Sequence, residues 1–168
     1  MSDLLYQRDG EKMYRAARAV TEGVLLYGHN HEPFCGMVEG KLLLNPGSVG
    51  GHFNKRINAE YGLLTLEHGK ASGELLQVPY DFGAFARQMV ESSLYRAAPV
   101  WCELTVEGMY LGYPCVLDFL RAAEERRTER DLPLEHGFFP NDVWDEVGTM
   151  WLREHTGWLE RATSHLHA

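Results

Sequence analysis

The hydrophobic pattern of this sequence changes its period near Pro79, and this change limits the folds that the chain can adopt. Before Pro79, short apolar runs are separated by Gly, Pro and Asn, as in strands that are joined by tight turns. After Pro79, apolar residues recur at the spacing of amphipathic helices. We therefore predict an α/β (α+β) fold with a sheet-rich first part and a helical second part.

The sheet-rich part is predicted to begin with one helix and one buried strand. Apolar residues between positions 11 and 20 have helical spacing and predict a helix there. The fully apolar run 24–27 ends at Gly28, as expected of a buried central strand that leads into a loop.

Two hairpins are predicted to complete this part. Their strands are expected over residues 34–38, 41–44, 61–66 and 74–80. The dipeptide Glu39-Gly40 favours a two-residue turn in the first hairpin, and 67–73 connects the strands of the second. Asn45-Pro46-Gly47 places Pro and Gly as a type II turn requires.

The helical part is predicted to contain several helices and one loop. Helices are expected from Phe82, over the apolar positions 116–123 ahead of the charged run 124–130, and from Asn141, with a loop over 133–140. The last of these helices has one apolar face, made of Val143, Trp144, Val147, Met150 and Trp151. We interpret this face as core or interface and not as a cofactor site.

Length and composition exclude several classes of protein. A chain of 168 residues has the size of a single domain. Its 16 basic and 24 acidic residues give a net charge of −8 without a basic stripe, so we do not expect a nucleic-acid partner. The three cysteines form no Cys-x-x-Cys pair, which favours a reducing compartment. Because no signal peptide and no apolar run of about 20 residues is visible, we expect a cytoplasmic protein that does not contact a membrane.

The chemistry of this sequence is concentrated in Gly28-His29-Asn30-His31-Glu32-Pro33. In an extended loop, residues two apart point to the same side, so the two imidazoles can face one pocket. Neighbouring histidines with this spacing can each bind one of two divalent cations that lie about 3.5–4 Å apart. The alternative is a pair of solvated or hydrogen-bonded loop histidines, and the spacing alone does not decide between the two.

A second motif, Asn45-Pro46-Gly47-Ser48-Val49-Gly50, follows after the first hairpin. The two motifs together resemble the C-terminal motif pair of the calcineurin-like metallophosphoesterase superfamily, in the small bacterial and archaeal branch that reads Gly-His-Thr-His and then Asn-Pro-Gly-Ser. The resemblance extends from about Leu4 to Ala97. It implies that residues 1–97 are the C-terminal part of a four-layer αββα metallophosphoesterase sandwich, and that residues 98–168 are a helical extension packed on it.

The resemblance also implies a site. In the family the first histidine of the pair binds one metal ion and the second binds the other, which gives these roles to His29 and His31. The active-site loops comprise Gly28, Asn30, Asn45, Pro46, Gly47 and Ser48, with Asn30 where the family more often has Thr. The implied cofactors are two divalent cations, for which we expect manganese, with zinc, iron and nickel as alternatives. Backbone amides of 45–50 are expected to orient a ligand side chain or a phosphate oxygen.

The family's earlier motifs do not precede His29. The sequence contains no Asp-x-His, no Gly-Asp with the carboxylate that bridges the metals, and no Gly-Asn-His with the general acid, so we assign no catalytic residue to this chain. The string His29-Asn30-His31 is not a nuclease signature, because that signature is spread over a hairpin and a helix. The other histidines are interpreted as turn residues (His68 and His136), a loop residue (His52) and solvated tail residues (His165 and His167).

Two classes of function follow. The first is part of a dinuclear metal-dependent phosphoesterase that hydrolyses a phosphodiester or phosphomonoester, with the missing motifs in an N-terminal half on the same gene or on a separate chain. The second is a non-catalytic binding or scaffolding module derived from that fold. Because the missing half would supply neighbours for the strand 24–27, we expect the chain to associate with that half or with a second copy of itself.

Overall fold

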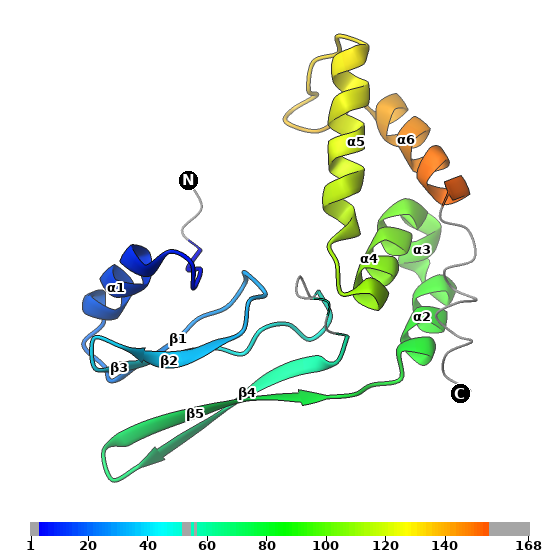
Figure 1. The fold of residues 1–168 in the computed structure, drawn as a ribbon. Coiled ribbons are helices and arrows are strands. Elements are labelled where there is room, and N and C mark those ends of the chain that lie inside the picture. The colour runs from blue at the N-terminus through cyan, green and yellow to red at the C-terminus, as the bar shows by residue number, and fades with distance from the viewer. Residues whose placement is uncertain (1–3, 52–54, 56, 155–168) are drawn as a thin grey trace. The chain divides into compact units, whose positions relative to one another are not determined.

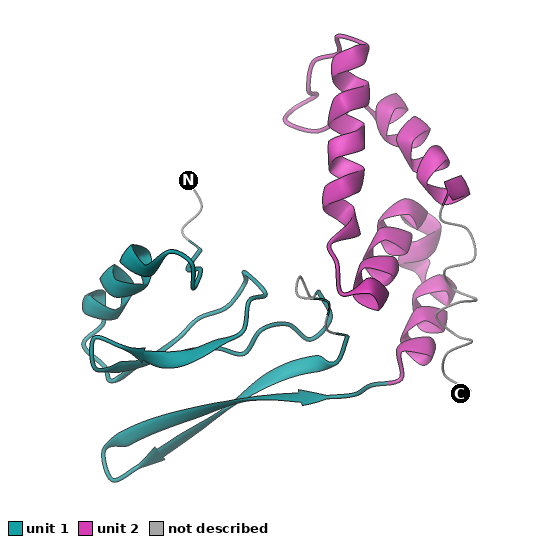
Figure 2. Cartoon of the chain, viewed as in Figure 1, with its two compact units in different colours: residues 1–80 teal, residues 81–168 magenta. Residues whose placement is uncertain are grey.

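The computed structural model describes residues 4–51, 55 and 57–154, and the chain forms two compact units, residues 1–80 and 81–168 (Figure 2). Strands lie in the first unit, and the helices α2 to α6 lie in the second. This arrangement confirms the α+β class, whereas the four-layer sandwich stays a prediction. The division after residue 80 differs from the boundary after residue 97, which marks the extent of the family resemblance and also stays a prediction.

Unit 1 begins with α1, Gly10–Ala19, as the spacing of apolar residues predicted (Figure 1). The side chain of Asp9 caps the helix by accepting a hydrogen bond from the backbone N–H of Lys12 at 3.1 Å. Met13 and Ala17 are buried and pack with Leu43 of the adjacent sheet. The apolar stripe of the helix therefore covers one face of that sheet.

The first sheet has three strands, β1 (Val24–Leu26), β2 (Phe34–Val38) and β3 (Lys41–Asn45), in the order β1-β3-β2. The two-residue turn of the predicted hairpin has Glu39 and Gly40 at φ 51° and 72°, as a type I′ turn requires. The prediction of a central strand over 24–27 was wrong. β3 is central and buried, because β2 pairs with it on one side and β1 pairs in parallel on the other.

The second sheet is a hairpin of β4 (Ala59–Glu67) and β5 (Lys70–Val78). Both strands are longer than predicted, and the predicted connection over 71–73 is part of β5. Small residues extend this strand because they allow close packing: a Cβ at Gly73 would lie 2.7 Å from Leu44 Cδ1, and the thiol of Cys35 donates to Gly73 O at 3.2 Å. His68 and Gly69 form the turn, which confirms the interpretation of His68.

Unit 2 consists of α2 (Phe82–Glu91), α3 (Ser93–Ala97), α4 (Pro99–Leu111), α5 (Cys115–Glu129) and α6 (Asn141–Glu154). Phe119 of α5 is fully buried, and the rings of Trp144 and Trp151 meet it edge-on at 4.8 and 6.0 Å between centroids. This packing confirms that Val143, Trp144, Val147 and Trp151 belong to the core, whereas Met150 of the predicted face is 51% exposed. α5 continues through most of the charged run, where Arg126 pairs with Glu129 at 3.1 Å and also with Glu146 of α6.

His136 lies in the turn of the loop between α5 and α6, as predicted. No helix among the described residues combines the length and the apolar character that a membrane crossing needs.

Candidate metal centre

The loop that carries the two histidines follows β1 directly. His29 and His31 have φ of 74° and 59°, in the left-handed region that non-glycine residues rarely adopt. The expectation of an extended loop was therefore wrong. Backbone strain of this kind persists only where surrounding contacts impose it, and it occurs preferentially at functional sites. His29 is exposed and His31 is half-buried.

Asn30 supplies the contacts that hold this backbone. Its side chain is 3% exposed and donates to the carbonyl oxygen of Leu5. Its Oδ1 accepts from Asn45 Nδ2 at 2.6 Å and from the backbone N–H of Glu32 at 3.0 Å. The residue between the histidines is therefore an anchor that ties the histidine loop to the second motif.

His31 is oriented by Ser48 of the second motif and by Gly51, which directly follows this motif. Its Nδ1 lies 2.5 Å from Gly51 O and 3.5 Å from Ser48 Oγ. A carbonyl oxygen only accepts, so Nδ1 carries the proton in this pair, and in the neutral ring the lone pair that can bind a metal is then on Nε2. A hydrogen bond from the second ring nitrogen to a backbone carbonyl is the usual arrangement of a metal-binding histidine.

The position of Gly51 requires a glycine. A Cβ there would lie 2.7 Å from His31 Nδ1 and 2.8 Å from His31 Cε1, closer than such atoms approach. Any side chain at residue 51 would therefore displace the imidazole.

Backbone amides of the loop 45–51 donate hydrogen bonds to side chains of the same loop. Gly47 N donates to Asn45 Oδ1 at 3.0 Å, and the amides of Gly50 and Gly51 donate to Ser48 Oγ at 3.3 and 2.8 Å. Ser48 N donates to the carboxylate of Glu60 at 3.1 Å. Of the two expected roles, these bonds support orientation of a ligand side chain rather than binding of a phosphate oxygen.

Glu60 is a residue of this site that the sequence interpretation missed. Its side chain is buried at the start of β4, where it also accepts from Gln77 Nε2 at 3.3 Å. Gly47, at φ 93°, fits against it, since a Cβ there would lie 2.1 Å from Glu60 Oε2. The available signal was a carboxylate directly before the predicted strand 61–66, but its partner in the loop could not be deduced from the spacing of residues.

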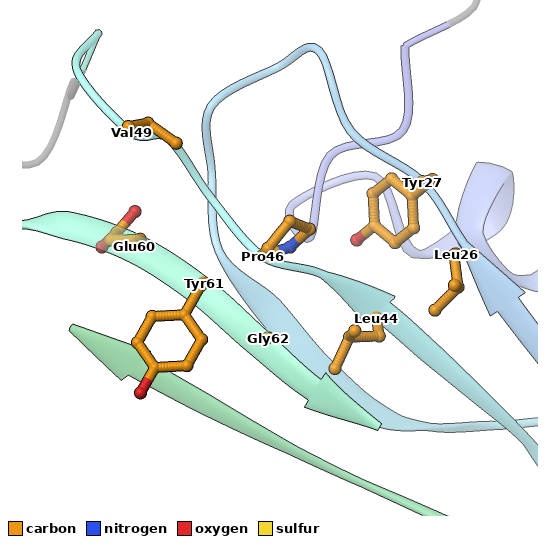
Figure 3. Close-up of a pocket in the computed structure, with 8 residues that line it drawn as sticks. All are labelled: Leu26, Tyr27, Leu44, Pro46, Val49, Glu60, Tyr61 and Gly62. Atoms are coloured by element: carbon orange, nitrogen blue, oxygen red, sulfur yellow. The ribbon is translucent and has the colours of Figure 1, made fainter. Parts of the chain in front are cut away.

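An open pocket of about 590 Å³ borders these loops. Figure 3 shows its lining by Leu26, Tyr27, Leu44, Pro46, Val49, Glu60, Tyr61 and Gly62. The hydroxyl of Tyr27 is buried without a hydrogen-bond partner among the described residues. Burial and the nearby carboxylate of Glu32 raise the pKa of Tyr27 to about 12, so this group keeps its proton at neutral pH.

The described residues form no complete set of metal ligands. Nowhere in 4–51, 55 and 57–154 do three His, Cys, Asp or Glu side chains come together as ligands of one ion. Of the predicted site residues, Asn30 bonds to Asn45 and His31 contacts Ser48, whereas the exposed His29 takes no part in these bonds. His52, His165 and His167 lie outside the described residues.

Comparison with known families gave one match. The family model described as "Calcineurin-like phosphoesterase superfamily domain" matches residues 4–69, which is less than half of the 168 residues. The match includes the histidine loop, the second motif and Glu60. Searches among curated proteins and among solved structures gave no match.

Proposed function

We propose that residues 4–69, which match the calcineurin-like phosphoesterase superfamily domain, form the histidine-bearing part of a dinuclear metal-dependent phosphoesterase. In this proposal His29 and His31 each bind one of two divalent cations, with manganese as the expected ion and zinc, iron or nickel as alternatives. When bound, such a pair of ions polarises the phosphoryl group and lowers the pKa of bound water.

The observation that carries the proposal is the orientation of His31. The hydrogen bond between Nδ1 and Gly51 O orients the ring, while Asn30 holds the loop through its bonds to Asn45 and Leu5. A solvated loop histidine needs neither constraint. The residues of this chain hold the imidazole of His31 in place and set the proton on its Nδ1.

The remaining ligands have to come from elsewhere. Two neutral imidazoles supply no negative charge to hold two dications, and the described residues bring no carboxylate to them as a third ligand. We therefore propose that the complete site needs the family's N-terminal motifs, supplied by the same gene or by a separate chain. The substrate class is a phosphomonoester or phosphodiester.

Metal binding tests the proposal directly. Titration of the metal-free chain with Mn²⁺, followed by the electron paramagnetic resonance of the unbound ion, should show binding that His29→Ala and His31→Ala each weaken. Gly51→Ala should weaken it about tenfold, as loss of an outer contact to a metal ligand typically does. His68→Ala and Gly10→Ala are matched controls, because His68 lies in the turn between β4 and β5 and a Cβ at Gly10, the first residue of α1, would meet open space.

Activity gives a second test. The chain alone should show little or no phosphoesterase turnover with added Mn²⁺. Robust turnover that His29→Ala abolishes would show that the further motifs are not needed. Mn²⁺ binding of equal strength in wild type and in His31→Ala would refute the metal proposal and favour the non-catalytic module.

A further inference from the structure

β1 is an apolar strand that, in the part of the chain that the structure describes, pairs on one edge only. Its neighbour is β3, which runs parallel to it from Val24 opposite Leu42 to Leu26 opposite Leu44. Parallel strands are normally buried between two neighbours. Edge strands usually carry a charge or a proline that discourages pairing with another chain, and Val24-Leu25-Leu26 has neither.

The backbone groups of β1 alternate between its two edges. Gly23 O accepts from Leu42 N at 2.9 Å, and Tyr27 N donates to Leu44 O at 3.0 Å, so residues 23, 25 and 27 face β3. The N–H and C=O groups of Val24 and Leu26 consequently point to the opposite edge. Two outward-facing residues separated by one inward-facing residue match the alternation of an antiparallel ladder.

Apolar side chains border this edge. Leu26 is 58% exposed and lines the pocket together with Leu44 and the exposed Tyr61 of β4 (Figure 3). Large apolar surface next to unpaired strand groups is typical of a site where another strand adds to the sheet.

We propose that β1 pairs with β1 of a second copy of this chain, antiparallel about a two-fold axis at Leu25. In this register Val24 lies opposite the second copy's Leu26, and Leu26 lies opposite its Val24. Each of these pairs exchanges two backbone hydrogen bonds, while Leu25 lies opposite its own equivalent in a pair without hydrogen bonds. The register agrees with the bonds of Leu25 to β3, and it joins two three-stranded sheets into one.

A second copy fits this edge because the edge is complementary to itself. The backbone pattern is unchanged by the two-fold rotation, and the cross-strand pairs are Val with Leu, which are both apolar. Charge does not oppose the pairing: the two exposed Glu22 carboxylates would lie at opposite ends, about 20 Å apart along the strands, beyond the ~10 Å screening length at 0.1 M salt. The inference concerns the chain without the family's N-terminal half, because that half, where present, competes with a second copy for the β1 edge.

Sedimentation velocity of the full chain should show a monomer–dimer equilibrium between 1 and about 100 μM protein. This concentration range covers dissociation constants in the micromolar range. Leu26→Lys should raise the dissociation constant at least about tenfold, because it places a charge in the central pairs. Leu63→Lys, at a 50% exposed position of β4, is the matched control and should leave the constant unchanged. Far-UV circular dichroism confirms that both variants are folded.

Hydrogen exchange tests the register. In the dimer the amides of Val24 and Leu26 should be protected, and in Leu26→Lys they should exchange rapidly. The amides of Leu25 and Tyr27 should stay protected in both proteins because they bond to β3. A monodisperse monomer over the whole range, a dimer that Leu26→Lys leaves intact, or rapid exchange of the Val24 and Leu26 amides in the dimer would each overturn the proposal.

Discussion

Replacement of Asn30 by alanine should destabilise unit 1 far more than a loop substitution normally does. The side chain makes three hydrogen bonds, to Leu5 O, Asn45 Nδ2 and Glu32 N. At about 1 kcal/mol each, their loss costs about 3 kcal/mol, and the buried amide of Asn45, left without its acceptor, adds about 1 kcal/mol. The expected loss of about 4 kcal/mol is a large share of the ~5–15 kcal/mol that stabilises a typical domain.

Urea denaturation, monitored by tryptophan fluorescence and by far-UV circular dichroism, measures this loss of stability. The four tryptophans, at positions 101, 144, 151 and 158, lie in the range 81–168, so tryptophan fluorescence reports on unit 2, while far-UV circular dichroism reports on both units. Asn30→Ala should move the dichroism transition to lower urea and leave the fluorescence midpoint unchanged. Thr65→Ala, at an exposed position of β4, should stay within about 0.5 kcal/mol of wild type. A loss below about 1 kcal/mol for Asn30→Ala, or an equal shift of both signals, would refute the reasoning.

Two further substitutions test the packing of unit 1. Gly73→Val should cost about 1–3 kcal/mol in urea denaturation, because its Cβ would lie 2.7 Å from Leu44 Cδ1 and 2.8 Å from Cys35 Sγ, whereas Ser72→Val on the exposed face of the same strand should be nearly neutral. Tyr27→Phe should leave stability at pH 7 equal or higher, because the buried hydroxyl has no partner among the described residues. The raised pKa of Tyr27, about 12 against 10.0, means that its contribution is intact below pH 10 and is lost as pH rises from 10 towards 12, so the wild type should lose stability there and Tyr27→Phe should lose less. Equal losses in that interval would contradict this account.

The elements that the sequence predicted correctly are those whose signals are local. The spacing of Met13 and Ala17 suffices for α1, and Glu39-Gly40 suffices for the first hairpin. The place of β1 within its sheet could not be predicted from the residues of the strand itself. An apolar run is typical of a strand with two neighbours, and the order β1-β3-β2 depends on which strands the rest of the fold brings beside it.

In the candidate site, too, features with a local signal could be predicted and features that depend on distant contacts could not. The spacing of His29 and His31 and the second motif were visible in the sequence, but their conformation was not, because it depends on contacts between distant residues. The bond of Asn30 to Leu5 spans 25 positions and that of His31 to Gly51 spans 20. Nothing in the sequence marked residue 51 as a position that requires glycine, because this requirement depends on the imidazole of His31 that lies against it.

These contacts form a chain of support that ends at His31. Glu60 holds the amide of Ser48, Ser48 Oγ accepts from the amide of Gly51, and Gly51 O accepts from His31 Nδ1. Glu60 stands on β4, so the second sheet takes part in orienting the imidazole through the loop between the sheets. Glu60, Ser48 and Gly51 are not proposed metal ligands, so their contacts orient the imidazole of His31 before a metal or any further ligand binds. Ordering costs about 1–2 kcal/mol per fixed residue, and here folding of unit 1 meets that cost in advance, so metal affinity should fall when Ser48 or Glu60 is altered even though neither touches the ion.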